Sequence, residues 1–461
     1  MLRRQFVRTL GAGSALGALG SLGMLSGCAT TGGNGPKVVV VGGGFGGATA
    51  AKYVRMWSDY GISVTLVEPN ASFISCPMSN LVLGGVKTMA DITTPYDGLT
   101  KNHGVKVVRD MVTAIDADKR IVKLAGGSEL PYDRLILSPG IDFMWEALPG
   151  MAKPGAQDTV LHSWKAGAQT VALRKQLEAM PDGGVYALAI PLAPYRCPPG
   201  PYERACQVAS YFQKAKPKSK VLILDANDDV TSKGPLFKKA WAERYQGMVE
   251  YRGKHALTDV DASTNTLKFE FQDDVKASVL NVIPPMRAGA IAVQTGLATA
   301  NKRWCEVDFL TFESKAAKNI HVLGDSIQLA PLMPKSGHMA NQHGKTCAAA
   351  VVALLTGQTP NPSPIYNNTC YSFVSPEDVV HVASVHTYDP VKKTMVTVAG
   401  SGGVSKAANE LEGRYALAWA QMIDHGIQHR TQAADMLELL GKGLPQEFSP
   451  FVWDEARHNQ A

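Results

Sequence analysis

A glycine-rich turn between a hydrophobic strand and a helix is the feature that most constrains the fold of this chain. Residues 37–41 read Lys-Val-Val-Val-Val, a run typical of a buried parallel strand. The next residues are Gly42-Gly-Gly44-Phe-Gly-Gly47, followed by a helix-forming segment. In this context Gly-x-Gly-x-x-Gly predicts a dinucleotide-binding βαβ unit. Gly42 forms the tight turn, Gly44 approaches the pyrophosphate and Gly47 packs the helix on the strand.

The next strand and its final acid complete this unit. The strand is expected at Ser63–Val67, and Glu68 closes it 21 residues after Gly47, where a carboxylate binds the adenosine ribose. A further strand is expected from Tyr132 and runs into a Ser-Pro-Gly turn at Gly140.

Two later segments extend the prediction to FAD. Residues 319–325 form a strand that ends in Gly324-Asp325, and we expect Asp325 to reach the flavin ribityl chain. A helix is expected within 335–355, beginning near Lys335 and ending before Gly357. Its N-terminus, facing the flavin, favours negative charge on the ring.

A second strand pair predicts another nucleotide-binding domain, with its glycine loop replaced. Strands are expected at 183–190 and 221–225. Between them, residues 191–201 read Pro-Leu-Ala-Pro-Tyr-Arg-Cys-Pro-Pro-Gly-Pro. Prolines lack backbone N–H groups and fix the chain, so this loop does not cradle a pyrophosphate in the usual way. The sequence therefore predicts the fold of an NAD-binding domain without NAD binding.

Several segments together resemble one protein family. The chain resembles the flavoprotein subunit of flavocytochrome c sulfide dehydrogenase, within the wider sulfide:quinone oxidoreductase and disulfide-reductase superfamily. The resemblance covers nearly the whole mature chain. Its marks are Cys76-Pro-Met-Ser-Asn80, Arg196-Cys197-Pro-Pro-Gly-Pro-Tyr-Glu203-Arg-Ala, Ile283-Pro-Pro-Met-Arg-Ala-Gly289, Gly324-Asp325, Met333-Pro-Lys-Ser-Gly337 and Asn368-Thr-Cys370-Tyr-Ser.

The resemblance implies roles for four residues. Cys197 and Cys370 match the cysteines of a redox disulfide above the flavin, with Cys370 nearer to the isoalloxazine ring. Cys76 matches a cysteine bonded covalently to the flavin 8α-methyl group, and Glu203 matches an acid beside the disulfide that accepts a proton. A disulfide is an electrophile for hydrosulfide. Attack therefore leaves a persulfide on one cysteine and a thiolate on the other.

The residues alone leave alternatives for each role. Cys197 and Cys370 also suit a structural disulfide, Cys76 a buried free thiol, and Glu203 a solvated acid at a helix N-terminus. Cys206, nine residues after Cys197, offers a competing thiol. The remaining cysteines and the histidines nearest the expected flavin segment are expected to be structural: Cys305, Cys347, His338 and His343.

The N-terminal segment predicts export to the periplasm. Arg3-Arg4-Gln-Phe6 and the apolar stretch behind it are typical of a twin-arginine signal, too short and glycine-broken to span a membrane. Leu25-Ser-Gly-Cys28 resembles a lipoprotein cleavage box, which would anchor the chain by a lipid on Cys28. Ordinary signal-peptidase cleavage is the alternative. Losing the signal lowers the formal net charge from +6 to +3, because it holds three arginines and no acid. This charge does not favour a nucleic-acid partner.

These observations predict an α/β flavoprotein with two Rossmann-like nucleotide-binding domains of the disulfide-reductase type and a C-terminal α+β interface domain. In the C-terminal third, strands are expected at 378–386 and 394–398 and a helix at 411–440. The expected divisions are a signal at 1–28, a linker at 29–36, an FAD domain at 37–150 and 300–358, the second Rossmann-like domain at 151–299 and the partner-facing domain at 359–461.

The expected activity is oxidation of sulfide to persulfide or polysulfide sulfur through FAD. The resemblance implies that electrons pass to a c-type cytochrome subunit in a heterodimer. The lost NAD loop, the export signal and the lack of a Cys-x-x-Cys-His haem motif in the chain favour this acceptor. Two alternatives remain: a sulfide:quinone oxidoreductase tethered at Cys28, and a thiol-redox partner of a sulfur-carrier protein. No metal site and no transmembrane span are expected.

Overall fold

The first sheet of the protein is parallel and carries the glycine-rich turn. The structure, a computed structural model, describes residues 35–426. The strand order is β19-β9-β1-β2-β5, and β1 pairs in parallel with both neighbours, so that Val39 lies between Thr65 and Leu135. The strands are β1 (Lys37–Val41), β2 (Ser63–Val67), β5 (Lys106–Val108), β9 (Arg134–Leu137) and β19 (Ile320–Val322).

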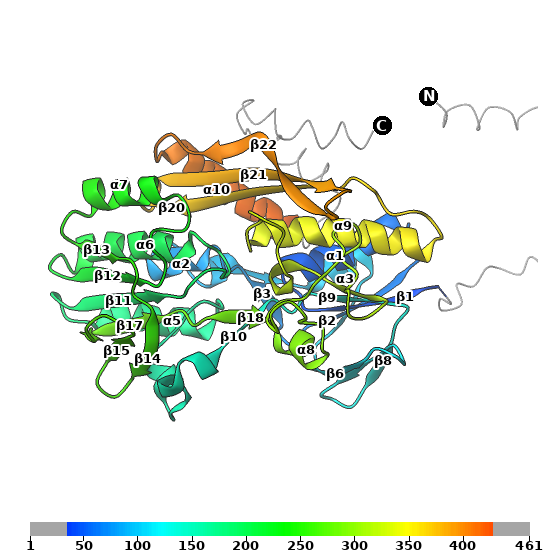
Figure 1. Cartoon of the computed structure of the whole chain (residues 1–461), viewed down its shortest axis with the longest axis horizontal. Helices are drawn as coiled ribbons and strands as arrows, with labels where there is room; N and C mark the ends of the chain where they lie inside the picture. The colour runs from blue at the N-terminus through cyan, green and yellow to red at the C-terminus, as the bar shows by residue number, and fades with distance from the viewer. Residues whose placement is uncertain (1–34, 427–461) are drawn as a thin grey trace, which may run out of the picture. The chain divides into compact units, whose positions relative to one another are not determined.

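Two helices far apart in sequence cover this sheet side by side (Figure 1). They are α1 (Phe45–Trp57) and α9 (Gly337–Leu355). They approach closely because small residues line the contact: a Cβ on Gly344 would lie 2.5 Å from the carbonyl oxygen of Gly46. Asn341 Nδ2 also donates to Thr49 Oγ1 at 2.9 Å.

Shorter elements surround the first sheet and connect it to the second. Strands β10 and β18 pair antiparallel between the two sheets. The elements are β3 (Ser72–Ile74), β4 (Thr93–Pro95), β6 (Val112–Asp116), β7 (Ile121–Leu124), β8 (Glu129–Pro131), β10 (Ile141–Phe143), β18 (Met286–Ala288), α2 (Ser79–Leu83), α3 (Asp97–His103), α4 (Ala156–Thr159), α8 (Ala290–Gln294), and the 3-10 turns η1 (Ala90–Ile92), η2 (Trp145–Ala147), η3 (Pro149–Ala152) and η4 (Gly324–Ser326).

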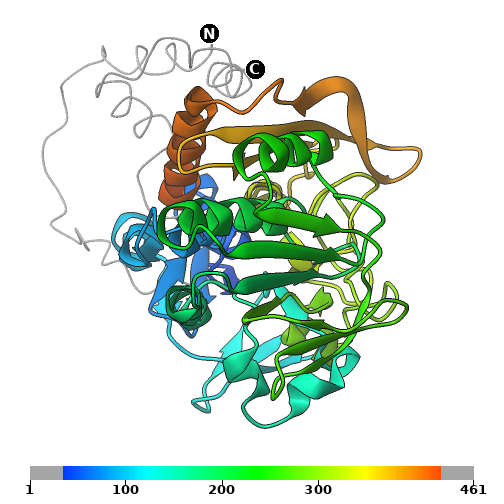
Figure 2. The ribbon, with the colours of Figure 1, turned by 90° about the vertical axis from the view of Figure 1, so that its left-hand side faces the viewer.

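The second sheet is also parallel, with the order β13-β12-β11-β17, and its green strands face the viewer in Figure 2. Strands β11, β12 and β17 are largely buried. Val260 and Leu267 of a small antiparallel sheet pack against Leu222 and Leu280. The elements are β11 (Val185–Ile190), β12 (Lys220–Asp225), β13 (Val249–Arg252), β17 (Val279–Val282), β14 (Leu257–Asp261), β15 (Thr266–Phe269), β16 (Val275–Lys276), α5 (Ala168–Ala179), α6 (Gly200–Ala215) and α7 (Gly234–Arg244).

The third sheet is antiparallel, in the order β20-β21-β22, and α10 packs against it (Figure 1). The elements are β20 (Ile365–Phe373), β21 (Val379–Asp389), β22 (Thr394–Val404) and α10 (Glu410–Gly426). Phe373 and Val379 join Ala416 of the helix in one apolar cluster. This cluster also contains Met78 and Leu81, so the third sheet is fixed to the segment that follows Cys76.

The predicted α/β fold class is confirmed. The predicted strands at 37–41, 63–67, 221–225, 378–386 and 394–398 are present, although β22 continues to Val404. The predicted helix at 411–440 begins at Glu410 and is described to Gly426, and the rest of that prediction lies outside the described residues. No helix within 35–426 has the length and apolar character needed to cross a bilayer.

Candidate active site

The turn between β1 and α1 has the geometry that a dinucleotide requires. Gly42 has a φ of +95°, and a Cβ on Gly47 would collide with the carbonyl oxygen of Gly42. In contrast, a Cβ on Gly44 would meet nothing within 4 Å, so there is free space at the N-terminus of α1. Glu68 lies at the same edge and accepts from the backbone N–H of Gly43 at 2.8 Å. The turn therefore fits the pyrophosphate and ribose of FAD.

Gly324, Asp325 and Lys335 lie together at the end of β19. Lys335 Nζ donates to the backbone oxygens of Asp325 and Ile327, both at 2.8 Å, and it lies 3.5 Å from the centre of the Trp304 ring. Burial lowers the pKa of Lys335 to about 7. Burial also raises the pKa of Asp325. The ammonium group thus holds the turn that carries Asp325 through its backbone, which leaves the carboxylate available to a ligand hydroxyl.

Cys197 lies on the proline-rich loop between β11 and α6. Its backbone has a φ of +57°, a left-handed conformation that is uncommon for a residue with a side chain. Its N–H donates to the carbonyl oxygen of Lys335 at 2.8 Å, and its own carbonyl accepts from Gly200 at 2.9 Å. The neighbouring Arg196 donates to the carbonyl oxygen of Trp164. These contacts fix the loop against the segment that begins α9.

Cys370 lies on β20, and the same segment positions this strand. Ser336 Oγ donates to Asn368 Oδ1 at 2.6 Å, and the N–H of Thr369 donates to His338 Nδ1 at 2.9 Å. Cys197 and Cys370 are free thiols in hydrogen-bonding contact with each other. The structure therefore brings together two cysteines that are 173 positions apart, through contacts to residues 335–338.

The two thiols differ in proton affinity. The hydrogen bond from Cys197 and the positive charge of Lys233 lower the pKa of Cys370 to about 7. The same hydrogen bond, burial and the negative charges of Cys370 and Glu203 raise the pKa of Cys197. Near neutral pH, Cys370 is thus the sulfur that ionises first. A thiolate is the reactive form of cysteine.

Glu203 lies in the first turn of α6 and is 5% exposed. Its carboxylate accepts from Asn80 Nδ2 at 3.1 Å and from the N–H of Phe373 at 3.0 Å. Burial raises the pKa of Glu203 to about 7. Glu203 is therefore a buried acid that exchanges its proton near neutral pH, joined by hydrogen bonds to the strand of Cys370.

Cys76 is joined to the same site through Asn80. Its Sγ is half-buried and accepts from the N–H of Ala166 at 3.4 Å. Four residues later, Asn80 donates to Glu203 and to the carbonyl oxygen of Gly200 at 3.1 Å, and it accepts from Arg204 at 3.0 Å. The segment from Cys76 to Asn80 is thus fixed to the start of α6.

The other cysteines within 35–426 are not part of this site. Cys206, Cys305 and Cys347 are fully buried in the hydrophobic core. Burial raises the pKa of Cys206 to about 12, which keeps its thiol protonated. The described residues also contain no cluster of metal-binding side chains.

In the second nucleotide domain, side chains of the protein bind the acid at the end of the second strand. Asp225, at the end of β12, corresponds in position to the ribose-binding acid of such domains. Its carboxylate accepts from Tyr202 at 2.7 Å, from Tyr251 at 3.2 Å and from Asn227 at 2.7 Å. Asp225 is fully buried, so its hydrogen-bonding capacity is used within the protein. Asp225 is thus engaged by the protein itself in the position where a ribose-binding acid would lie.

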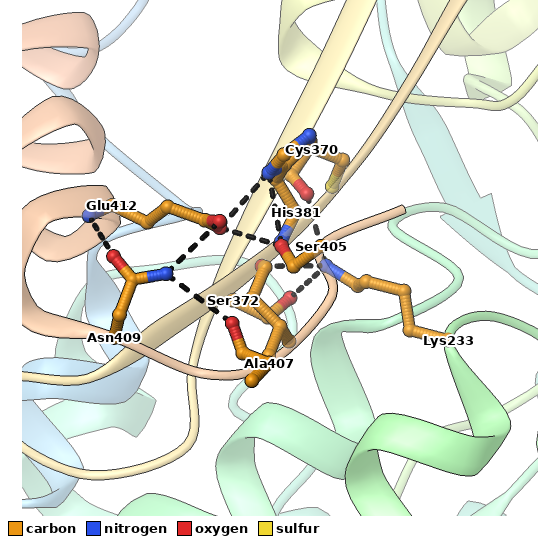
Figure 3. A network of polar contacts seen from close by, with 9 residues as sticks. Lys233, Cys370, Ser372, His381, Ser405, Ala407, Asn409 and Glu412 are labelled. Atoms are coloured by element: carbon orange, nitrogen blue, oxygen red, sulfur yellow. Dashed lines mark hydrogen bonds and ion pairs between the residues drawn. The ribbon is translucent and has the colours of Figure 1, made fainter. Parts of the chain in front are cut away.

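The roles of three residues of the site were not identified from the sequence. They are Lys233, Asn80 and His338, whose Nδ1 accepts from the N–H of Thr369. Lys233 is 7% exposed and donates to the carbonyl oxygen of Cys370 at 2.9 Å (Figure 3). In the sequence, Lys233 precedes Gly-Pro at the start of a helix, and this signal is indistinguishable from an ordinary surface lysine.

Comparisons with known families agree with this geometry. The central domain of the sulfide dehydrogenase [flavocytochrome c] flavoprotein chain matches residues 170–284. The flavin-binding domain of flavocytochrome c sulphide dehydrogenase matches 362–427, and the pyridine nucleotide-disulphide oxidoreductase domain matches 36–181.

Individual relatives fall into the same group. The chain is 65% identical over 46 residues to the sulfide dehydrogenase flavoprotein chain of Chlorobaculum thiosulfatiphilum, covering 10% of this chain and 94% of that sequence. It is 26% identical over 303 residues to the mitochondrial sulfide:quinone oxidoreductase of Dictyostelium discoideum, 64% of this chain and 66% of that protein. The crystal structure of the Aquifex aeolicus sulfide:quinone oxidoreductase shares the fold, with a TM-score of 0.68, 19% identity and coverage of 89% and 96%.

The fold and the paired thiols define an FAD-dependent oxidoreductase of the disulfide-reductase class. Within that class, the chain belongs to the family of flavocytochrome c sulfide dehydrogenase flavoprotein chains. It is thus a flavoprotein of the sulfide dehydrogenase and sulfide:quinone oxidoreductase type.

Proposed function

We propose that this chain oxidises sulfide to persulfide or polysulfide sulfur at Cys197 and Cys370 and passes the electrons to a c-type cytochrome subunit. The observation that carries the proposal is the contact between the two thiols, held by the segment that also holds Asp325. FAD, when bound, accepts a pair of electrons and releases them singly, which suits a one-electron haem acceptor.

The residues supply the sulfur chemistry. With Cys197 and Cys370 joined as a disulfide, hydrosulfide attacks one sulfur, the bridge breaks, and the other cysteine leaves with the electron pair. The products are one persulfide and one thiolate. Glu203, whose pKa is raised by burial to about 7, takes up the proton of the persulfide near neutral pH.

The proposed acceptor rests on what the chain has lost. The proline loop lacks the N–H groups of a glycine loop, and Asp225 is hydrogen-bonded to protein side chains, which supports an acceptor other than NAD. The relative from Chlorobaculum is described as the flavoprotein chain of a flavocytochrome c. The rival acceptor is a quinone, because the relatives from Dictyostelium and mouse are sulfide:quinone oxidoreductases.

Steady-state turnover with each acceptor decides between these functions. We expect sulfide-dependent reduction of cytochrome c to exceed reduction of a soluble quinone at equal concentrations of acceptor. The opposite ranking would overturn the proposed acceptor and favour the quinone. Absence of sulfide turnover with both acceptors would instead favour a thiol-redox partner of a sulfur-carrier protein.

The flavin is proposed to be bonded to Cys76. We expect acid-denatured protein to keep its yellow colour with the polypeptide on a desalting gel, and Cys76→Ala to release it. Cys347→Ala, which removes a buried thiol of α9 away from Asp325 and Lys335, serves as the control and keeps the colour. Complete release of flavin from the unaltered protein would disprove the covalent bond without affecting FAD binding itself.

A further inference from the structure

Lys233 is a buried cation against the strand that carries Cys370 (Figure 3). It precedes α7 and has a left-handed backbone, with a φ of +56°. Its ammonium donates to the carbonyl oxygen of Cys370 at 2.9 Å, to Ser372 Oγ at 2.7 Å and to the carbonyl oxygen of Val380 at 3.3 Å. All three N–H groups are thus used on β20 and β21. A lysine is seldom buried without a compensating negative charge.

The segment that carries Lys233 also contacts the loop of Cys197. Thr231 Oγ1 lies 2.8 Å from the hydroxyl of Tyr195, and this hydroxyl donates to the carbonyl oxygen of Pro198 at 3.2 Å. Thr231 therefore contacts the loop that carries Cys197, and Lys233 contacts the strand that carries Cys370. This arrangement fixes Lys233 relative to the backbone segments that carry the two cysteines.

The charges around Lys233 come from four elements. Burial lowers the pKa of Lys233, and the negative charges of Cys370 on β20, Glu203 on α6 and Cys197 on the preceding loop oppose this effect. Glu412 of α10 acts in the same direction from the other side of the strands, where it contacts His381 at 2.9 Å. Arg196 and the buried Arg204 are further cations near the pair. The charge of Arg196 lowers the pKa of the Cys197 thiol, and Arg204 interacts with both Cys197 and Glu203.

We propose that Lys233 is a positioning residue that makes Cys370 the leaving sulfur of the disulfide, so that hydrosulfide attacks Cys197. The inference rests on the proposed sulfide oxidation. A new S–S bond forms between the hydrosulfide sulfur and Cys197 Sγ. The bond between Cys197 and Cys370 breaks, and its electron pair stays on Cys370 Sγ beside the cation. The proton remains on the outer sulfur until Glu203 accepts it. Leaving is faster for the more stable thiolate, which the charge of Lys233 favours.

The first test measures ionisation of Cys370 without sulfide. The reduced holoprotein is alkylated with iodoacetamide at a series of pH values, and the Cys370 and Cys197 peptides are quantified separately by mass spectrometry. In Lys233→Met, we expect the midpoint for Cys370 to rise by about one pH unit or more. Lys233→Arg retains the charge and is expected to restore most of the shift. Lys238 is an exposed lysine of α7 that pairs with Asp229, so Lys238→Met is the matched control and leaves the midpoint unchanged.

The second test maps the persulfide. One equivalent of sulfide is added to the oxidised protein, and the persulfide is trapped by alkylation and located by mass spectrometry. We expect the persulfide on Cys197. In Lys233→Met, we expect the ratio of persulfide on Cys197 to persulfide on Cys370 to be several-fold smaller. If Lys233→Met does not fold, Ser372→Ala replaces it, because loss of this acceptor loosens the ammonium and raises the midpoint by a smaller amount.

These outcomes separate the inference from the function on which it rests. An unchanged Cys370 midpoint in the folded variants, or a persulfide on Cys370 in the unaltered protein, would overturn the role of Lys233 even if sulfide turnover is normal. A normal shift of the midpoint in a protein that does not turn over sulfide would instead overturn the proposed function.

Discussion

At the scale of single residues, the site turns two chemically identical cysteines into different groups. Cys370 lies beside a buried ammonium and accepts a hydrogen bond from Cys197, so its pKa falls to about 7. Cys197 shares its hydrogen bond with an ionisable sulfur and lies in a more negative environment, so its pKa rises. This asymmetry predicts which sulfur leaves and which one keeps the proton.

Replacing the cysteines singly should therefore give two different proteins. In Cys197→Ser, Cys370 can still ionise, so a long-wavelength absorbance band from a thiolate beside the flavin is expected to persist. In Cys370→Ser, no such band is expected. Both variants should lose sulfide-dependent flavin reduction by orders of magnitude, and the losses should not add in the double variant, because the cysteines act as one unit.

Cys206→Ser is the control for this comparison. Cys206 is fully buried in α6, so its replacement should cost some stability but leave turnover near normal. A variant of Cys206 as inactive as the other two would show that Cys206 belongs to the redox bridge. Stopped-flow reduction by sulfide measures all three variants under the same conditions.

Glu203 gives a prediction about stability and pH. The pKa of Glu203 is about 7 in the folded protein, above the ordinary 4.5, because of burial. Between these two pH values the folded protein holds a proton that the unfolded chain has lost, so the free energy of unfolding falls as pH rises. Glu203→Gln removes this dependence. Relative to the unaltered protein, the variant should be more stable at pH 8 than at pH 5, by roughly 1–3 kcal/mol.

Thermal unfolding of the holoprotein at pH 5 and pH 8 measures this difference. Glu243→Gln, a change of an exposed acid on α7, is the control and should follow the unaltered protein at both pH values. Parallel melting temperatures of Glu203→Gln and the unaltered protein would show that Glu203 is not protonated in the folded state near neutral pH.

At the scale of elements, the turn before α1 contains one glycine that the fold requires and another that only ligand binding requires. Gly47 is required by the fold, because a Cβ there would collide with the carbonyl oxygen of Gly42. Gly44 is not required by the protein, because its Cβ would meet nothing within 4 Å. Only a ligand at the N-terminus of α1 explains why a glycine is useful at position 44.

Two alanine variants test this division. Gly44→Ala should fold with a normal circular dichroism spectrum and melting profile but contain much less flavin per protein. Gly47→Ala should lose both the fold and the flavin, because helix and strand cannot pack. Full flavin content in Gly44→Ala would mean that the pyrophosphate does not approach this residue.

The elements that the sequence predicted well are those with local signals. The glycine turn, the central strands of both parallel sheets and the start of α9 are coded by neighbouring residues, whereas β5, β13 and β17 were not predicted. The third sheet was predicted without β20 and with a shorter β22. In the structure, Gly402 and Gly403 continue β22 by pairing with Ser384 and Ala383. The roles of Cys197 and Cys370 came from a family resemblance, whereas Lys233 was missed, because its contact to Cys370 joins residues 137 positions apart.

At the scale of the whole molecule, no short part of the chain contains the site. The residues that fit FAD begin at Gly42 and continue to Lys335, and the matched flavin-binding domain occupies 362–427. Cofactor binding therefore requires that most of the chain has folded. A protein of this kind is suited to an export route that carries folded proteins, and Arg3-Arg4, which lies outside the described residues, is proposed to direct it to the periplasm.

Cell fractionation tests this proposal together with the anchor. Cys28→Ser should move the protein from the membrane fraction to the soluble periplasmic fraction if a lipid on Cys28 anchors it, and should have no effect if ordinary cleavage removes the signal. Cys28 also lies outside the described residues, so this experiment addresses the sequence pattern directly.

Changing both arginines to lysine tests the coupling of folding to export. In the variant with Arg3→Lys and Arg4→Lys, we expect the protein to stay in the cytoplasmic fraction. Its FAD content per protein should be unchanged, because the residues that fit FAD begin at Gly42. Arg8→Lys, in the same segment, is the matched control and should be exported normally. Export of the doubly changed protein would contradict the twin-arginine signal. A retained protein without flavin would show that the cofactor is added after export and not when the chain folds.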